Sequence, residues 1–183
     1  MYNLLILNKK GYLFLLFFSI TTLLIAQQNI FDACRQGDLD VIERLYNINP
    51  NIVNAEEDNG YSALVLSCYY GHEDIVNFLV DKVKSLNNKT SYGSPLMAAA
   101  VKGYDNIVEI LLNHDANPDI TDNQGVTAAH YAVLFKNYKI VEKLVNAKAD
   151  FNIKNNVNAF VNSLINVRPQ STVLILIMNG CIF

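Results

Sequence analysis

The chain of 183 residues repeats itself with a period of 32 to 34 residues. Paired aliphatic residues return at Val41-Ile42, Ile75-Val76, Ile107-Val108 and Ile140-Val141, each pair within a similar local sequence. A repeat of this length holds one small supersecondary unit, which cannot bury its apolar face alone. The repeat therefore predicts an array in which the contacts between neighbouring units provide the core.

Patterns inside each unit predict two short helices joined by a tight turn. In the second helix, apolar residues at i, i+1, i+4 and i+5 form one continuous face, as in residues 75–80. The first helix is followed by glycine, which ends a helix in a left-handed turn. These glycines are Gly37, Gly71 and Gly103. The hydroxyl groups of Ser94 and Thr127 precede first helices, where they can cap the helix N-terminus.

Several motifs recur in order and in phase with this repeat. Residues 127–132 read TAAHYA, residues 94–99 read SPLMAA, and residues 122–127 read DNQGVT. Over roughly residues 28–154 the chain resembles the ankyrin repeat, whose period is about 33 residues and whose signature is T-P-L-H-x-A. In that family the histidine of the signature is structural, so the resemblance implies that His130 hydrogen-bonds the turn through Thr127.

The resemblance implies an all-α fold, an ankyrin-repeat solenoid of four to five helix-turn-helix units with short β-turn loops. The expected units are residues 27–57, 58–90, 91–121, 122–154 and a degenerate unit at 155–183. The last unit has an apolar segment at the expected second-helix position, but its first helix lacks the small residues of the motif. Terminal repeats are commonly atypical because one side meets solvent. Its apolar character favours either a covering partner or a marginally stable end.

The first 26 residues differ from the rest of the chain. Lys9 and Lys10 precede an uncharged apolar run at residues 11–25, and Ala26 follows it. This order is typical of a secretory signal peptide, and the run is short for a membrane-spanning helix. We therefore expect an exported protein, periplasmic or secreted. The alternative is a retained signal anchor that tethers the repeats to a membrane.

The composition excludes several classes of function. Hydrophobic residues make up 51% of the chain, which indicates a folded protein. All 17 acidic residues but only twelve of the 14 basic residues follow the leader, so the body is acidic and nucleic-acid binding is not expected. Cys34 and Cys68 occupy one repeat position and are expected to be small buried residues rather than a disulfide or metal site.

No sequence motif indicates catalysis. No two histidines have the spacing of a helix-borne metal pair, and nucleotide-binding glycine motifs and a G-x-S-x-G motif are absent. We expect no cofactor, no metal and no enzymatic activity. The predicted function is protein–protein interaction by a monomer, unless the apolar C-terminal end pairs. An accessory domain of an enzyme system is the less favoured alternative.

The resemblance also implies where a protein partner binds, since ankyrin proteins use a concave groove formed by turn tips and by the ends of the first helices. Carried over to this sequence, the predicted contact residues are Asn59, Tyr61, Tyr69, Tyr70, Tyr92, Val101, Lys102, Asn123, Gln124, Val126, Leu134 and Phe135. Arg35 and Gln36 are their equivalents in the first unit. The set is rich in aromatic residues, which are enriched at protein interfaces. Packing of these rings against a neighbouring unit is the alternative interpretation.

Overall fold

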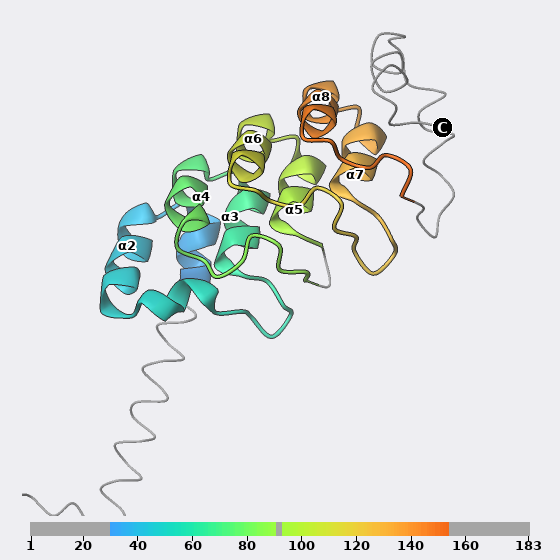
Figure 1. The fold of residues 1–183 in the computed structure, drawn as a ribbon. Coiled ribbons are helices and arrows are strands. Elements are labelled where there is room, and N and C mark those ends of the chain that lie inside the picture. Colours follow the sequence, from blue (N-terminus) through green and yellow to red (C-terminus); the bar gives the residue numbers. More distant parts are fainter. Residues whose placement is uncertain (1–29, 91–92, 154–183) are drawn as a thin grey trace, which may run out of the picture.

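A computed structural model describes residues 30–90 and 93–153 and shows two layers of helices (Figure 1). A helical segment at residues 30–36 comes first. The elements that follow are α2 (Leu39–Ile48), the 3₁₀-helix η1 (Pro50–Asn54), α3 (Ala63–Tyr70), α4 (Glu73–Val80), α5 (Pro95–Lys102), α6 (Asp105–Asn113), α7 (Ala128–Leu134) and α8 (Tyr138–Asn146). The all-α prediction is confirmed for this part of the chain.

Two sequence predictions fall outside the described residues: the N-terminal leader at residues 1–26 and the degenerate unit at residues 155–183. Within residues 30–90 and 93–153, no helix has the length and apolar character required to cross a membrane.

The units stack in the order of the sequence. Helices α3, α5 and α7 pack side by side in what we call the inner layer, and α2, α4, α6 and α8 form the outer layer (Figure 1). Loops between the units project together from one side of the stack (Figure 1). Two of these loops are tightened by antiparallel bridges, from Glu56 to Ser62 and from Thr90 to Gly93. Stacked helical hairpins with short turn-like loops are therefore observed as predicted.

Hydroxyl groups begin the inner helices. The side chains of Ser62, Ser94 and Thr127 accept hydrogen bonds from backbone N–H groups in the first turns of α3, α5 and α7. Pro95 occupies the first position of α5, where its missing N–H costs no helical hydrogen bond. The caps predicted at Ser94 and Thr127 are confirmed, and Ser62 provides an equivalent one.

Glycine turns end the first helices and receive a side chain from the next unit. Gly37, Gly71 and Gly103 all have φ values of 79° to 83°, in the left-handed region. A Cβ atom at Gly71 would lie 2.6 Å from Cζ of Tyr104, and one at Gly37 would lie 2.7 Å from the His72 ring. Glycine is therefore required at these turns both for backbone conformation and for the close approach of the next unit.

Three residues other than glycine hold the same left-handed conformation. Lys136, with φ 59°, occupies the turn position that glycine fills in the other units. Asp115 (φ 62°) and Lys148 (φ 59°) lie in exit loops after α6 and α8, where the family motif has glycine. An L-residue is strained in this region, so each of these positions costs stability.

Side chains that follow the turns also bond to the preceding unit. Nε2 of His72 lies 3.1 Å from the carbonyl oxygen of Arg35, and Nδ2 of Asn137 donates to the carbonyl oxygen of Ala100 at 3.1 Å. A carbonyl only accepts, so Nε2 of His72 carries the proton. These bonds give carbonyl groups near the ends of first helices a partner from the next unit. The Ala100 carbonyl also accepts the N–H of Gly103, at 3.3 Å.

A second series of bonds connects the exit segments. In each bond a side-chain oxygen accepts the backbone N–H of a residue 30 or 31 positions later, at 2.7 to 2.8 Å. The accepting side chains are Asn54, Asn87 and Asp119. The donors are the N–H groups of Lys84, Asn117 and Asp150. The interface between units is therefore polar at this edge and apolar in its centre.

The apolar centre contains the predicted residues. The apolar faces of α4, α6 and α8 are buried except for the partly exposed Leu112. The small inner-helix residues such as Ala99, Ala100 and Ala132, which let the units approach closely, are also buried. Cys34 and Cys68 are buried free thiols, as expected. Burial raises the pKa of Cys34 to about 11 and that of Cys68 further. Both thiols are therefore protonated and unreactive at neutral pH.

His130 has the structural role that the resemblance implied. Its Nδ1 accepts the backbone N–H of Thr127 at 3.1 Å and lies 2.8 Å from the Thr127 hydroxyl oxygen. The backbone N–H of His130 in turn donates to the Thr127 hydroxyl oxygen at 3.4 Å, and with the Thr127 N–H bond this completes a capping box at the start of α7. Burial lowers the pKa of His130, so the ring stays neutral at physiological pH.

The glycine turns provide a stability test. Gly71→Ala should lower the free energy of unfolding by about 2–4 kcal/mol, because strain adds to a clash with Tyr104. Gly103→Ala should cost only about 1–2 kcal/mol, since the nearest side-chain atom, on Asn137, would lie 3.3 Å from the new Cβ. Urea unfolding measures both values. Equal losses of unfolding free energy in the two variants would show that the clash with the Tyr104 ring adds no cost.

Relief of strain at the fourth turn should raise the free energy of unfolding, which the glycine replacements lower. Lys136→Gly should raise the free energy of unfolding by about 0.5–1 kcal/mol, because glycine adopts the left-handed region without strain. Lys136→Ala keeps the strain and serves as the control. A gain for the alanine variant as large as that for glycine would contradict the backbone explanation.

The lowered pKa of His130 predicts a pH dependence. The unfolded chain, with an ordinary histidine pKa of about 6.5, binds a proton more readily than the folded chain, so stability should fall as the pH drops from about 7 to about 5. His130→Asn should flatten that part of the curve. Thermal unfolding across this pH range measures the slope. An unchanged slope in the variant would assign the effect to other groups.

Candidate functional site

The ends of the inner helices present large side chains to solvent. We call Tyr69, Tyr70, Val101, Lys102, Leu134 and Phe135 the ridge, because they are the last residues of α3, α5 and α7 or the residue that caps the helix. Tyr69 and Tyr70 are 39% and 45% exposed, and Leu134 and Phe135 are 57% and 50% exposed. These values leave about half of each side chain available to a partner.

Neighbouring side chains hold the ridge aromatics in place. Tyr69 and Tyr70 meet edge to face with their ring centroids 5.4 Å apart, and Tyr70 stacks on His72 at 6.5 Å. Phe135 stacks on Tyr131 at 6.5 Å. Each of these rings is therefore partly packed against a neighbouring ring and partly exposed. These ring contacts lie within single units, whereas the alternative interpretation had the rings pack against a neighbouring unit.

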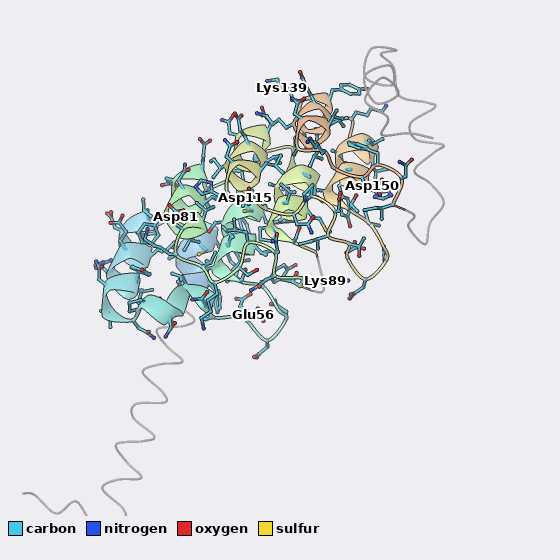
Figure 2. All side chains as sticks on the ribbon, in the orientation of Figure 1. Glu56, Asp81, Lys89, Asp115, Lys139 and Asp150 are labelled. Atoms are coloured by element: carbon cyan, nitrogen blue, oxygen red, sulfur yellow. The ribbon has the colours of Figure 1, made fainter. Side chains whose placement is uncertain are left out.

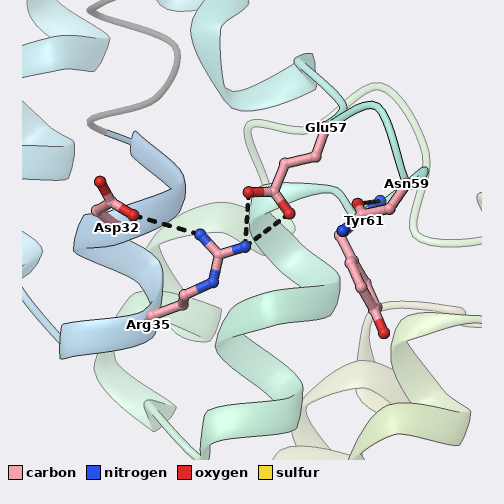
Figure 3. A network of polar contacts seen from close by, with 5 residues as sticks. All are labelled: Asp32, Arg35, Glu57, Asn59 and Tyr61. Atoms are coloured by element: carbon pink, nitrogen blue, oxygen red, sulfur yellow. Dashed lines mark hydrogen bonds and ion pairs between the residues drawn. The ribbon is translucent and has the colours of Figure 1, made fainter.

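An ion pair fixes the loop that precedes α3 (Figure 3). Arg35 donates from one guanidinium nitrogen to both carboxylate oxygens of Glu57, at 2.5 and 2.6 Å, and its other nitrogen lies 3.4 Å from Asp32. The bond to Glu57 raises the pKa of Arg35, so the pair stays charged. Within the loop, the Glu57 N–H donates to the carbonyl of Tyr61, and Asn59 Oδ1 accepts the Tyr61 N–H. Arg35 is thus paired within the protein.

The loop before α7 is held by a buried carboxylate. Oδ1 of Asp122 accepts the backbone N–H groups of Gln124 and Val126, at 2.8 and 2.9 Å, and Oδ2 accepts the Tyr131 hydroxyl at 2.9 Å. Burial and the bond to Asp122 raise the pKa of Tyr131 to about 12, so the phenol stays neutral. Asn123 and Gln124 are consequently exposed at the tip of a fixed loop.

The remaining predicted contact residues differ in accessibility. Asn59 and Lys102 are exposed, whereas Tyr61 and Val101 are only partly exposed. Val126 is the exception among the described residues. It is only 9% exposed because the loop turns its side chain inward, so it cannot provide a substantial contact surface. Tyr92 lies outside the described residues.

Two further residues border the ridge and were not predicted as contacts. Tyr104, 37% exposed, follows the turn after α5, and Lys136 follows Phe135 and is exposed. The repeat position of Tyr104 is that of His72, which was interpreted as structural, and its ring does pack against Gly71. From the sequence, only the aromatic character of Tyr104 could have indicated a contact residue.

A groove of about 670 Å³ lies between α6 and α8 in the outer layer. Side chains of both charges line it, including the ion-paired Glu109 and Lys143 and, at its edge, Asp105 and Lys139. In the part of the chain that the structure describes, no three histidine, cysteine or acidic residues gather to form a metal site. The groove presents mixed charges to solvent.

Comparison with known proteins agrees with the architecture. A family model described as ankyrin repeats (3 copies) matches residues 30–122 and 85–155. The chain is 32% identical over 129 residues to ankyrin repeat protein FPV031 of fowlpox virus, which covers 68% of this chain and 38% of the relative. It is 33% identical over 106 residues to BTB/POZ domain-containing protein 3 of Schizosaccharomyces pombe, covering 58% of this chain and 20% of that relative.

A third relative, ankyrin repeat and SAM domain-containing protein 6 of Mus musculus, is 31% identical over 108 residues, which cover 58% of this chain and 12% of that protein. The chain thus spans less than half the length of each of these three relatives. Stacked helical hairpins with glycine turns and hydroxyl caps, matched by the family model over most of the chain, show that this protein belongs to the ankyrin-repeat family.

Proposed function

We propose that this chain is a non-catalytic interaction module that binds a protein or peptide partner on the ridge and the adjoining loop tips. The observation that carries the proposal is the exposure of four large side chains, Tyr69, Tyr70, Leu134 and Phe135, at one pair of repeat positions. Exposed apolar groups gathered on one surface are characteristic of interaction sites. The ankyrin family supports the same class of function, because its repeats typically bind protein partners.

The ridge also has the rigidity that a binding site needs. Each tyrosine or phenylalanine is already packed on one side, so binding immobilises few additional torsions. Aromatic residues that are partly buried before binding are frequent hot spots of interfaces. Asn59, Asn123 and Gln124, on loops fixed by internal bonds, would add hydrogen bonds at the rim.

The absence of catalysis is part of the proposal, and the engagement of the reactive groups supports it. The ring nitrogens of His72 and His130 that contact Arg35 and Thr127 stabilise the fold. The thiols of Cys34 and Cys68 are buried and protonated at neutral pH. None of these side chains is poised to act on a substrate.

We further propose that residues 1–26 direct export and are removed, so that the repeats act in the periplasm or outside the cell. The order of Lys9-Lys10, the apolar run and Ala26 supports cleavage. Retention of the segment would instead give a membrane-tethered adaptor. N-terminal sequencing of the protein from the producing cell distinguishes these outcomes, since cleavage gives Gln27 as the first residue and retention gives the original N-terminus.

The binding site can be tested by affinity capture from extracts of the producing cell. We expect the wild-type chain to retain a partner that the Tyr70→Ser, Phe135→Ser double variant loses, with affinity reduced at least about tenfold for each ring removed. Ile48, 82% exposed at the end of α2, provides the matched control, because Ile48→Ser removes an exposed apolar group away from the ridge. Equal retention by the double variant would place the interface on another surface.

A further inference from the structure

Lys102 differs from every other residue of the ridge in its charge. Its Nζ lies 4.2 Å from the centroid of the Tyr69 ring, at a distance typical of a cation–π contact. It occupies the repeat position that holds Tyr70 in the unit before and Phe135 in the unit after. The ridge therefore has one ammonium group between two apolar pairs, Tyr69-Tyr70 and Leu134-Phe135.

The ammonium of Lys102 has no carboxylate partner among residues 30–90 and 93–153. The ion pairs there include those of Arg35 with Asp32 and Glu57 and of Lys143 with Glu109, and none involves Lys102. Arg35, which occupies the repeat position of Val101 in the first unit, is thus neutralised within the protein. Arg35 therefore holds a loop, whereas the Lys102 ammonium is available to an external group.

The carboxylate closest to Lys102 in the sequence is directed elsewhere. Asp105 lines the outer-layer groove together with Lys139, which lies on α8 (Figure 2). In the preceding unit, Glu73 accepts a hydrogen bond from Asn106, and Asp74 accepts the N–H of Ile75. The acidic residues at the starts of the outer helices therefore serve the outer layer, and the ridge keeps an uncompensated positive charge at its centre.

A partner that covers the ridge removes water from this ammonium. Burial of an unpaired charge is costly, and an anion on the partner offsets that cost. The ring of Tyr69 occupies one side of the Lys102 ammonium. The N–H donors on the other side of the ammonium are available to a carboxylate. An acidic side chain at this point would also select the partner and speed its association.

We propose that the partner segment carries an aspartate or glutamate that docks on Lys102, with an apolar side chain on either side of it. One apolar side chain packs on Tyr69 and Tyr70, and the other packs on Leu134 and Phe135. The ligand is thus an acidic protein segment with an apolar–acidic–apolar order. This proposal rests on the proposed function, because it assigns the partner chemistry of the same surface.

The test uses a phage-displayed library of random peptides selected on the immobilised full-length chain. Three further proteins are selected in parallel: Lys102→Glu, Lys82→Glu and the Tyr70→Ser, Phe135→Ser double variant. Lys82 is the matched control because its Nζ also lies over an aromatic ring, 4.1 Å from the centroid of Phe78, but in the outer layer. Both glutamate variants change the net charge equally, so a general charge effect appears in both.

We expect the wild-type chain and Lys82→Glu to enrich peptides with an acidic residue between apolar ones. These peptides should bind Lys102→Glu at least about tenfold more weakly. Ridge-dependent peptides without acidic enrichment, or acidic peptides that bind Lys102→Glu equally well, would overturn the acidic-partner inference and leave the proposed function intact. If no selected peptide depended on Tyr70 and Phe135, the proposed function itself would fail.

A second copy of the chain is the remaining candidate occupant of the ridge. Sedimentation of the wild-type chain without peptide tests it. A monomer is the expected result. Self-association that both Lys102→Glu and the double variant abolish would seat a second copy on the ridge and overturn the proposal of a separate acidic partner.

Discussion

The seating of one unit's side chain in the preceding unit's turn is the contact on which this stack depends. The rings of His72 and Tyr104 approach Gly37 and Gly71 so closely that a single methyl group would collide with them. The hydrogen bonds of His72 and Asn137 to carbonyl groups of the preceding unit lie at the turns of Gly37 and Gly103. Apolar burial drives the units together, but it is non-directional. The seated side chains fix the distance and rotation at which neighbouring units meet.

The geometry of the ridge follows from these contacts between the turn of one unit and the side chain of the next. Tyr70, Lys102 and Phe135 directly precede the turn positions, so a constant relation between turns aligns their side chains along the inner layer. Replacing a ridge residue changes the surface without disturbing the core, because the buried residues occupy the earlier turns of the same helices and the ridge residues lie at their ends. Recognition and stability therefore depend on different side chains of one short helix. This separation allows an ankyrin scaffold to serve different partners.

Much of this structure could be predicted from the sequence, because the informative contacts are local or recur with the repeat. The repeat period predicted the stack, and Ser94 and Thr127 predicted where two helices start. The shared repeat position of Cys34 and Cys68 indicated that both are buried. Side-chain direction within a loop was less accessible, and Val126 was wrongly expected to be exposed. The pairing of Arg35 with Glu57 joins residues 22 positions apart, and no periodic pattern indicates it.

The joints between units are directional, since each turn receives a side chain from the unit that follows it. Contacts of this head-to-tail kind do not close on themselves, and an array built from identical joints has no inherent end. Lys136 holds the same left-handed conformation at the fourth turn, but it carries a side chain where the earlier turns have none. A ring seated there as His72 and Tyr104 are seated at Gly37 and Gly71 would collide with the Cβ atom of Lys136. The residue at each turn therefore decides how closely a side chain of another unit can approach it.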